Sequence, residues 1–142
     1  MTGTPGTPGT PGAPGSPGTP GATERGRLLL ADDDDDVASA YARAFTVHGF
    51  AVSRARDGHQ AIAIVQSLPA LAAAVVDLVL PGVGGLDVVR AIRQRHPACR
   101  IVAVTGLGQP VTERLFRESG ADVFLAKPVE LKELLAAVAP AC

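Results

Sequence analysis

The stretch AAVVDLVLP at residues 73–81 begins with an apolar run that ends on Asp77, and a proline follows four positions later. The stretch LLLADD at residues 28–33 follows the same plan, because its apolar run also ends on acid, at Asp32 and Asp33. Short continuous apolar runs are typical of strands buried on both faces of a parallel sheet. The two stretches therefore predict parallel strands that carry carboxylates at their ends.

Helix-length amphipathic segments alternate with further runs of this kind along the chain. We expect strands at residues 28–31, 51–55, 73–77, 101–105 and 123–126, and helices at 37–48, 59–67, 85–95, 111–119 and in the last segment before the carboxyl terminus. The inward faces of the first and last helices are predicted to hold Val37, Tyr41, Ala44 and Phe45, and Leu131, Leu134, Leu135 and Val138, respectively. This alternation predicts an α/β fold, a doubly wound five-stranded parallel sheet with five helices distributed over its two faces.

The first residues have a different composition. From residue 3 to residue 21 glycine recurs at every third position in Gly-X-Pro triplets. The segment has no side chain that could build a core, so ordering it would cost entropy without compensation. We interpret residues 1–25 as a disordered, partly polyproline-II tail, and residues 26–142 as the folded domain. A partner-binding tether and a misplaced start codon are the alternatives for the tail.

Composition excludes several classes of protein. The net charge of −1 argues against broad electrostatic binding to nucleic acid or to an anionic membrane. No apolar run approaches the roughly 20 residues that span a bilayer, and the amino terminus lacks the features of a signal peptide. Cys99 and Cys142 have no metal-ligand spacing. We therefore expect a cytoplasmic protein whose cysteines are reduced.

Polar residues follow the predicted strands at the edge where such sheets bind ligands, beyond the carboxyl ends. These residues are Asp32, Asp33, Asp77, Thr105 and Lys127. Three carboxylates at one edge would repel one another without a cation, and oxygen ligands suit Mg²⁺. A carboxylate beside Mg²⁺ can attack a phosphoryl group, while a hydroxyl and an ammonium group meet the charge of that group. The sequence therefore predicts phosphoryl chemistry.

Over roughly residues 26–139 the chain resembles the receiver domain of two-component response regulators. Four motifs carry the resemblance, namely LLLADD at 28–33, VVDLVLPG at 75–82, VAVTG at 102–106 and GADVFLAKP at 120–128. Each motif is weak by itself, but all four in this order at successive strand ends are specific. The resemblance implies a flavodoxin-like receiver fold that signals through phosphorylation of an aspartate.

The resemblance also implies a metal site. Asp77 would be the phospho-acceptor and a ligand of Mg²⁺. Asp33 would bind the ion directly, Asp32 would assist through water, and Val79 would contribute its backbone carbonyl.

The remaining roles concern the acyl phosphate and the response to it. Thr105 and Lys127 would bind the phosphoryl oxygens. Phe124 would be the aromatic switch residue that turns inward as Thr105 moves toward the phosphate. The Lys127–Pro128 peptide bond is expected to be cis, a form almost confined to bonds before proline.

Partners follow from the same resemblance. The donor would be a sensor histidine kinase or a histidine phosphotransfer protein, and the response would appear at the face of the fourth helix, fifth strand and fifth helix. Because the sequence stops at Cys142, we expect a stand-alone receiver without direct DNA contact or membrane attachment. The downstream protein stays open, as does homodimer formation. The chain would be a signalling domain rather than an enzyme for an outside substrate.

The sequence departs from the family pattern in three places. The acidic pair lies within five aspartates, Asp32 to Asp36, so a register of Asp33 and Asp34 is the alternative to the one chosen. Gly84 stands where many relatives carry aspartate, which should loosen that loop. Val79 and Leu107 are apolar at positions that tune attack by water on the phosphate, which predicts slow autodephosphorylation.

Two other functions are alternatives to this prediction. A haloacid-dehalogenase-type phosphohydrolase would use the motif DDDDV at residues 33–37 with Asp33 as nucleophile, but it leaves Asp77 without a role. A docking-only receiver would never be phosphorylated, although every pocket position is filled here. The aspartate run alone does not make a metal site, because adjacent residues cannot all face one ion. His48, His59 and His96 are expected to lie on the surface.

Overall fold

A computed structural model of the protein describes residues 25–106 and 118–139. Its strands are β1 (Gly26–Ala31), β2 (Phe50–Ala55), β3 (Ala73–Asp77), β4 (Arg100–Thr105) and β5 (Val123–Ala126). Its helices are α1 (Asp35–Val47), α2 (Gly58–Ser67), α3 (Gly85–Arg95) and α5 (Leu131–Val138). Most of the helix predicted at 111–119 lies outside the described residues, as do residues 1–24 of the predicted tail and Leu107.

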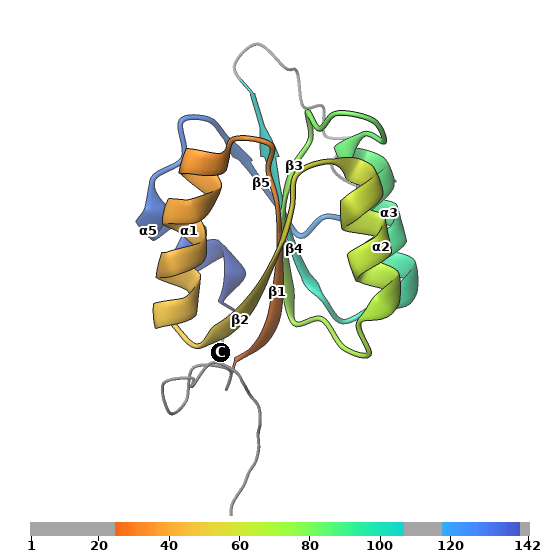
Figure 1. Ribbon diagram of the computed structural model, residues 1–142, viewed down its shortest axis with the longest axis horizontal. Helices are drawn as coiled ribbons and strands as arrows, with labels where there is room; N and C mark the ends of the chain where they lie inside the picture. The colour runs from red at the N-terminus through yellow and green to blue at the C-terminus, as the bar shows by residue number, and fades with distance from the viewer. Residues whose placement is uncertain (1–24, 107–117, 140–142) are drawn as a thin grey trace, which may run out of the picture.

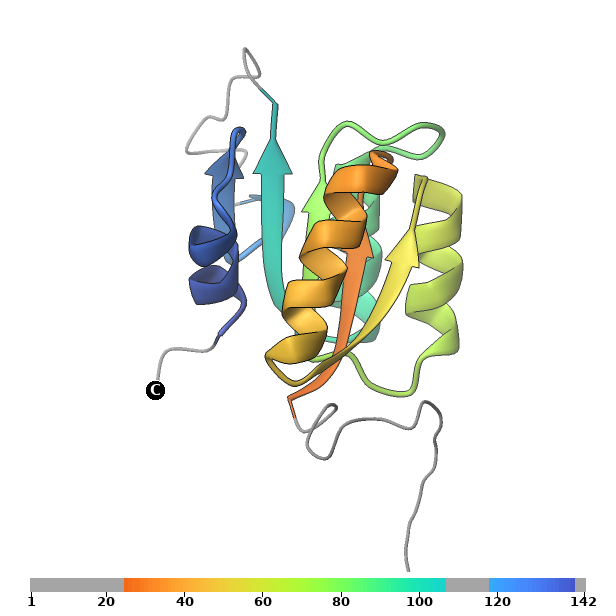
Figure 2. The same cartoon turned by 60° about the vertical axis from the view of Figure 1, so that its left-hand side comes forward.

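The five strands form one parallel sheet in the order β2-β1-β3-β4-β5. All strand arrows point the same way in Figure 2. Helices α1 and α5 cover one face of the sheet, and α2 and α3 cover the other (Figure 1). The predicted parallel sheet with helices on both faces is confirmed, and its order places β1 beside β3, the two strands that end in carboxylates.

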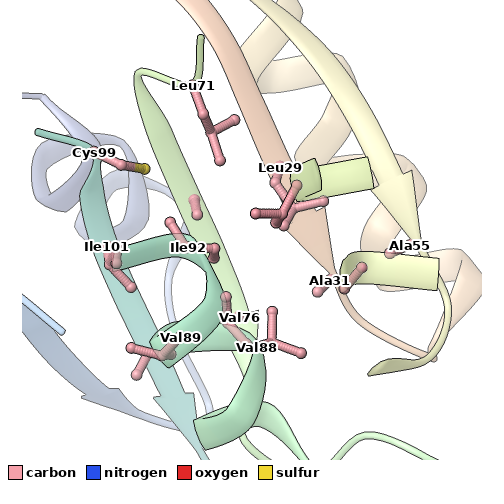
Figure 3. Close-up of a cluster of buried hydrophobic side chains, with 14 of the residues drawn as sticks. Leu29, Ala31, Ala55, Leu71, Val76, Val88, Val89, Ile92, Cys99 and Ile101 are labelled. Atoms are coloured by element: carbon pink, nitrogen blue, oxygen red, sulfur yellow. The ribbon is translucent and has the colours of Figure 1, made fainter. Parts of the chain in front are cut away.

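Alternate side chains of each strand supply two separate cores, as the period of a strand requires. In β1, Leu29 and Ala31 pack on the side of α2 and α3, whereas Leu28 and Leu30 pack on the side of α1 and α5. Figure 3 shows the first of these cores, in which Ile92 of α3 lies among the strand residues. All strand residues named here are fully buried, so the strands occupy the centre of the domain.

Two residues predicted on the inward helix faces are exposed. Val37 lies in the first turn of α1 and Leu131 begins α5, and their exposed fractions are 36% and 38%. A residue in the first turn of a helix has helical neighbours on one side only, so the apolar stripe begins one turn later. Phe45 and Leu134, from the same two predicted stripes, are fully buried.

The prediction that all three histidines lie on the surface was wrong for His96. His48 and His59 are exposed, but only 7% of His96 is accessible. Its Nε2 lies 2.9 Å from the carbonyl oxygen of Val65, so the ring joins the end of α3 to α2. A hydrogen bond of this kind satisfies a buried polar group, which is why the position can be buried.

Cys99 is buried just before β4, and burial raises the pKa of its thiol to about 12. The thiolate is the reactive form of cysteine, so this thiol stays protonated and inert at neutral pH. No described helix has the length and apolarity needed to cross a membrane.

Replacing Gly58 with alanine is expected to destabilise the domain. A Cβ on Gly58 would lie 1.9 Å from the carbonyl oxygen of Val83, and the Gly58 amide donates to the Pro81 carbonyl at 3.2 Å. Forcing extra volume into such a contact costs about 1–3 kcal/mol. Urea unfolding should show this loss. Gly84→Ala is the matched control, because its Cβ would meet nothing within 4 Å. Equal midpoints for the two variants would contradict the prediction.

Candidate functional site

Three carboxylates meet beyond the ends of β1 and β3. Asp32, Asp33 and Asp77 each place an oxygen within 4.8 Å of the other two. Asp32 and Asp77 are buried, with 6% and 3% of their surface accessible, whereas Asp33 is exposed. The cluster forms because the sheet order makes β1 and β3 neighbours.

Local hydrogen bonds fix the orientation of the two buried carboxylates. Oδ1 of Asp32 accepts from the backbone N–H of Asp34 at 2.9 Å, and Oδ1 of Asp77 accepts from the N–H of Val79 at 2.9 Å. Each carboxylate thus uses one oxygen to hold its own loop. For Asp77, the other oxygen, Oδ2, binds a lysine from the far end of the site.

The remaining aspartates of the run have other partners. Asp34 caps α1, because its Oδ1 accepts from the N–H groups of Asp36 and Val37, each at 3.1 Å. Asp35 forms ion pairs with Arg56 at 2.6 Å and Arg54 at 3.6 Å. The geometry therefore favours the register counted from the apolar run, in which Asp32 and Asp33 form the acidic pair.

Lys127 reaches the acceptor strand from the end of β5. Its Nζ lies 2.7 Å from Oδ2 of Asp77. Burial by itself lowers the pKa of Lys127, but the hydrogen bond to Asp77 and the nearby acidic charges outweigh burial, so the pKa rises and the ammonium group stays charged. The backbone N–H of Lys127 donates to the Thr105 carbonyl at 2.8 Å, which continues the pairing of β4 and β5 past their ends.

Burial raises the pKa of Asp32, with the charges of Asp77 and Asp33 acting in the same direction. The N–H of Asp34 and the charge of Lys127 oppose this rise. A metal ion requires its carboxylate ligands to be ionised, so a divalent cation here would stabilise the charged form. One ammonium group among three carboxylates leaves net negative charge, and this donor set fits a hard cation such as Mg²⁺.

The two residues predicted to switch lie on β4 and β5. Thr105 is buried, and its hydroxyl donates to the carbonyl of Leu125 at 3.4 Å, across to the neighbouring strand. Phe124 is partly buried against the core of α2 and α3. Val79 exposes 55% of its surface beside the acceptor. The Lys127–Pro128 bond is cis, as predicted. The structure thus gathers Asp32, Asp33, Asp77 and Lys127, with Thr105 at the adjacent strand end.

A pocket of about 460 Å³ opens between α1, α5 and the strand ends. Its polar part is formed by Asp32, Asp34, Asp77 and Lys127, and its remaining walls are largely apolar. Tyr41, predicted on the inward face of the first helix, packs against the core on that side of the sheet. It also lines this pocket, and its hydroxyl donates to the Val129 carbonyl at 3.1 Å. A tyrosine on an inward helix face was the available signal, but its partner 88 residues away has no signature in the sequence.

Gly85 was also missed. A Cβ on this residue would lie 2.5 Å from the carbonyl oxygen of Asp77, so the start of α3 packs directly against the end of β3. The consecutive glycines at 84 and 85 were the signal, and only the tertiary contact shows which of them is required.

Comparisons with known proteins show which proteins this chain is similar to. A family model described as the response regulator receiver domain matches residues 28–139. The chain is 41% identical over 107 residues to the photosynthetic apparatus regulatory protein RegA of Cereibacter sphaeroides, an alignment that covers 75% of this chain and 58% of that protein. It is 38% identical over 117 residues to the DNA-binding response regulator MtrA of Mycolicibacterium smegmatis, covering 82% of this chain and 50% of that protein.

A solved structure agrees with these relatives. A response regulator protein from Burkholderia pseudomallei, with a phosphorylated aspartic acid, a calcium ion and citrate, has a TM-score of 0.72 and 29% sequence identity to this chain. The match covers 80% of this chain and 66% of that one. The chain spans less than two thirds of the length of both curated relatives named above.

Proposed function

Because this chain belongs to the response regulator receiver domain family of two-component systems, we propose that it accepts a phosphoryl group on Asp77 from a phosphohistidine donor. One observation carries the proposal. Asp77 is buried at a strand end, shares a site with Asp32 and Asp33, and pairs through Oδ2 with Lys127 at 2.7 Å. No other described aspartate combines these features.

The chemistry follows from this arrangement. A carboxylate oxygen of Asp77 attacks phosphorus, the P–N bond of the donor breaks, and its electron pair returns to the imidazole ring, which takes up a proton. Lys127 meets the negative charge on the equatorial oxygens, and Thr105 supplies a hydroxyl donor from the next strand. Mg²⁺, held by Asp33, Asp77 and the Val79 carbonyl with Asp32 assisting through water, would supply further neutralisation of charge.

The proposal draws support from the Burkholderia protein, whose structure contains a phosphorylated aspartic acid and a calcium ion. A divalent cation and an aspartyl phosphate thus occur in a protein similar in fold to this chain. The output that we propose is a change at the face of the fourth helix, β5 and α5, with Thr105 and Phe124 as the switch residues. Its described part consists of β5 and α5.

Other expectations stay predictions. They are stand-alone action, the absence of direct DNA contact, a cytoplasmic location, a possible homodimer and the absence of enzyme activity on an outside substrate. The relative named a DNA-binding response regulator is matched over 50% of its length only, so its printed activity is said of that protein. The phosphohydrolase alternative has less support, because Asp33 is exposed and Lys127 pairs with Asp77.

Incubation of the protein with acetyl phosphate tests the proposal. Intact mass should increase by one phosphoryl group in the presence of Mg²⁺ and not after chelation, because the acidic cluster needs the cation to admit an anionic donor. Phosphoramidate and a purified histidine kinase serve as further donors. Failure of all three donors would favour the docking-only receiver.

The aspartyl phosphate is expected to persist for minutes or longer once the donor is removed. The exposed Val79 side chain has no group that could orient an attacking water. Val79→Asn places a hydrogen-bonding amide there and should shorten the lifetime. Val47→Asn is the matched control, because Val47 is 82% exposed on α1. The lifetime is measured by intact mass after rapid desalting, and a half-life of a few seconds for the unaltered protein would contradict the prediction.

A further inference from the structure

The loop that carries Lys127 is held by a contact from the other side of the pocket. The hydroxyl of Tyr41, on α1, donates to the carbonyl of Val129 at 3.1 Å. The half-buried tyrosine ring lines the same pocket as Asp77 and Lys127. Helices α1 and α5 lie on the same face of the sheet (Figure 1). On this face the Tyr41–Val129 bond connects the helix after β1 to the loop between β5 and α5.

Hydrogen bonds also hold both ends of the loop from Lys127 to Glu130. The N–H of Lys127 donates to the Thr105 carbonyl at 2.8 Å, and the N–H of Glu130 donates to Oε1 of Glu133 at 3.2 Å. Pro128 has no N–H to contribute. The Tyr41 hydroxyl bonds to the middle of the loop and ties it to α1, while the Val129 side chain packs against the core on the same face of the sheet.

The position of this loop decides where the Lys127 ammonium group lies. The side chain of Lys127 is 40% exposed and has a flexible stem, whereas that of Asp77 is 4% exposed and is held by the Val79 N–H. The 2.7 Å contact between Nζ and Oδ2 thus depends on the backbone that carries the lysine. Displacement of that backbone would move the cation away from the attacking carboxylate.

We propose that Tyr41 is a positioning residue for phosphoryl transfer, whose hydroxyl holds the loop of residues 127–130 so that Lys127 meets Asp77 and the incoming phosphoryl group. This inference rests on the proposed function of Asp77. It assigns to Tyr41 an effect that is exerted entirely through Lys127. Removal of the Tyr41 hydroxyl should therefore slow phosphoryl transfer only while Lys127 is present.

A double-mutant cycle tests that dependence. Tyr41→Phe keeps the ring and deletes the hydroxyl, and it should slow labelling by acetyl phosphate about fivefold, the size expected for one hydrogen bond. In a Lys127→Met background the same change should have no effect. An equal loss in both backgrounds, or no loss in either, would overturn the proposal. Thr46→Val is the matched control, because it deletes a hydroxyl on the same helix that donates only locally, to the Ala42 carbonyl.

A second measurement does not depend on phosphoryl transfer. Lys127 and Lys132 are the two lysines of the chain, so limited acetylation with acetic anhydride, followed by peptide mass spectrometry, compares Lys127 with an exposed internal control. Tyr41→Phe should raise the Lys127 to Lys132 ratio about fivefold as the ion pair with Asp77 loosens. An unchanged ratio overturns the positioning role. If Tyr41→Phe raises this ratio but no phosphoryl donor labels the unaltered protein, the positioning role of Tyr41 is supported. That outcome counts against the proposed function alone.

Discussion

Asp77→Asn is expected to reduce phosphoryl uptake from acetyl phosphate below detection. The amide keeps the size of the carboxylate, but it is a far weaker nucleophile and cannot form the acyl phosphate. The backbone contact to Val79 can be kept, because the amide oxygen also accepts a hydrogen bond. Intact mass after incubation with Mg²⁺ and acetyl phosphate measures the loss.

The matched control for this variant is Asp87→Asn. Asp87 is exposed on α3 and pairs with Arg90 at 3.1 Å, a surface ion pair that contributes little. Full labelling is expected for this control. The Asp33→Asn variant separates the two phosphoryl chemistries. Labelling that survives in Asp77→Asn and disappears in Asp33→Asn would reverse the assignment and establish the phosphohydrolase nucleophile.

Lys127→Met is expected to slow phosphoryl uptake about 100-fold at saturating Mg²⁺, the loss found when one preorganised donor to a developing charge is removed. Methionine has a similar length but no charge. It therefore leaves Oδ2 of Asp77 without the partner that now lies at 2.7 Å. The rate is read from the growth of the phosphorylated mass with time.

Lys132→Met provides a demanding control for Lys127. Lys132 is the second lysine of the chain and lies exposed on α5. The two variants carry the same change of charge and differ in position. Equal rates for them would show that Lys127 acts through the net charge of the domain rather than through contact with Asp77.

The strand ends were predictable because their signal is local. The apolar runs of residues 28–31 and 73–76 each stop where a carboxylate begins, and a strand buried on both faces tolerates no charge in its interior. The assignment of Asp32 and Asp77 to one edge of the sheet followed from parallel topology alone. The structure places both residues in one cluster.

Contacts between distant segments could not be predicted from the residues. The Lys127–Asp77 ion pair joins residues 50 positions apart. Parallel topology predicted that both residues lie at one edge of the sheet, but it did not predict the direct contact between them. His96 was misjudged because burial of a polar ring depends on a carbonyl of another helix. The exposure of Val37 and Leu131 shows that helical periodicity gives the direction of a side chain but not whether a neighbour reaches it.

The five aspartates after β1 have a consequence for the angular setting of α1. Deletion of any one of these aspartates yields the same shorter sequence, because the five residues are identical. The distance along the chain from β1 then decides which role each remaining aspartate takes. Counted from β1, the shorter run still supplies the acidic pair, the helix cap and the partner of the arginines. Every later residue of α1 would shift by one position, which turns its apolar side, with Ala38 and Phe45, about 100° away from the sheet. The length of the run thus sets the rotational phase of a helix rather than the charge of the pocket.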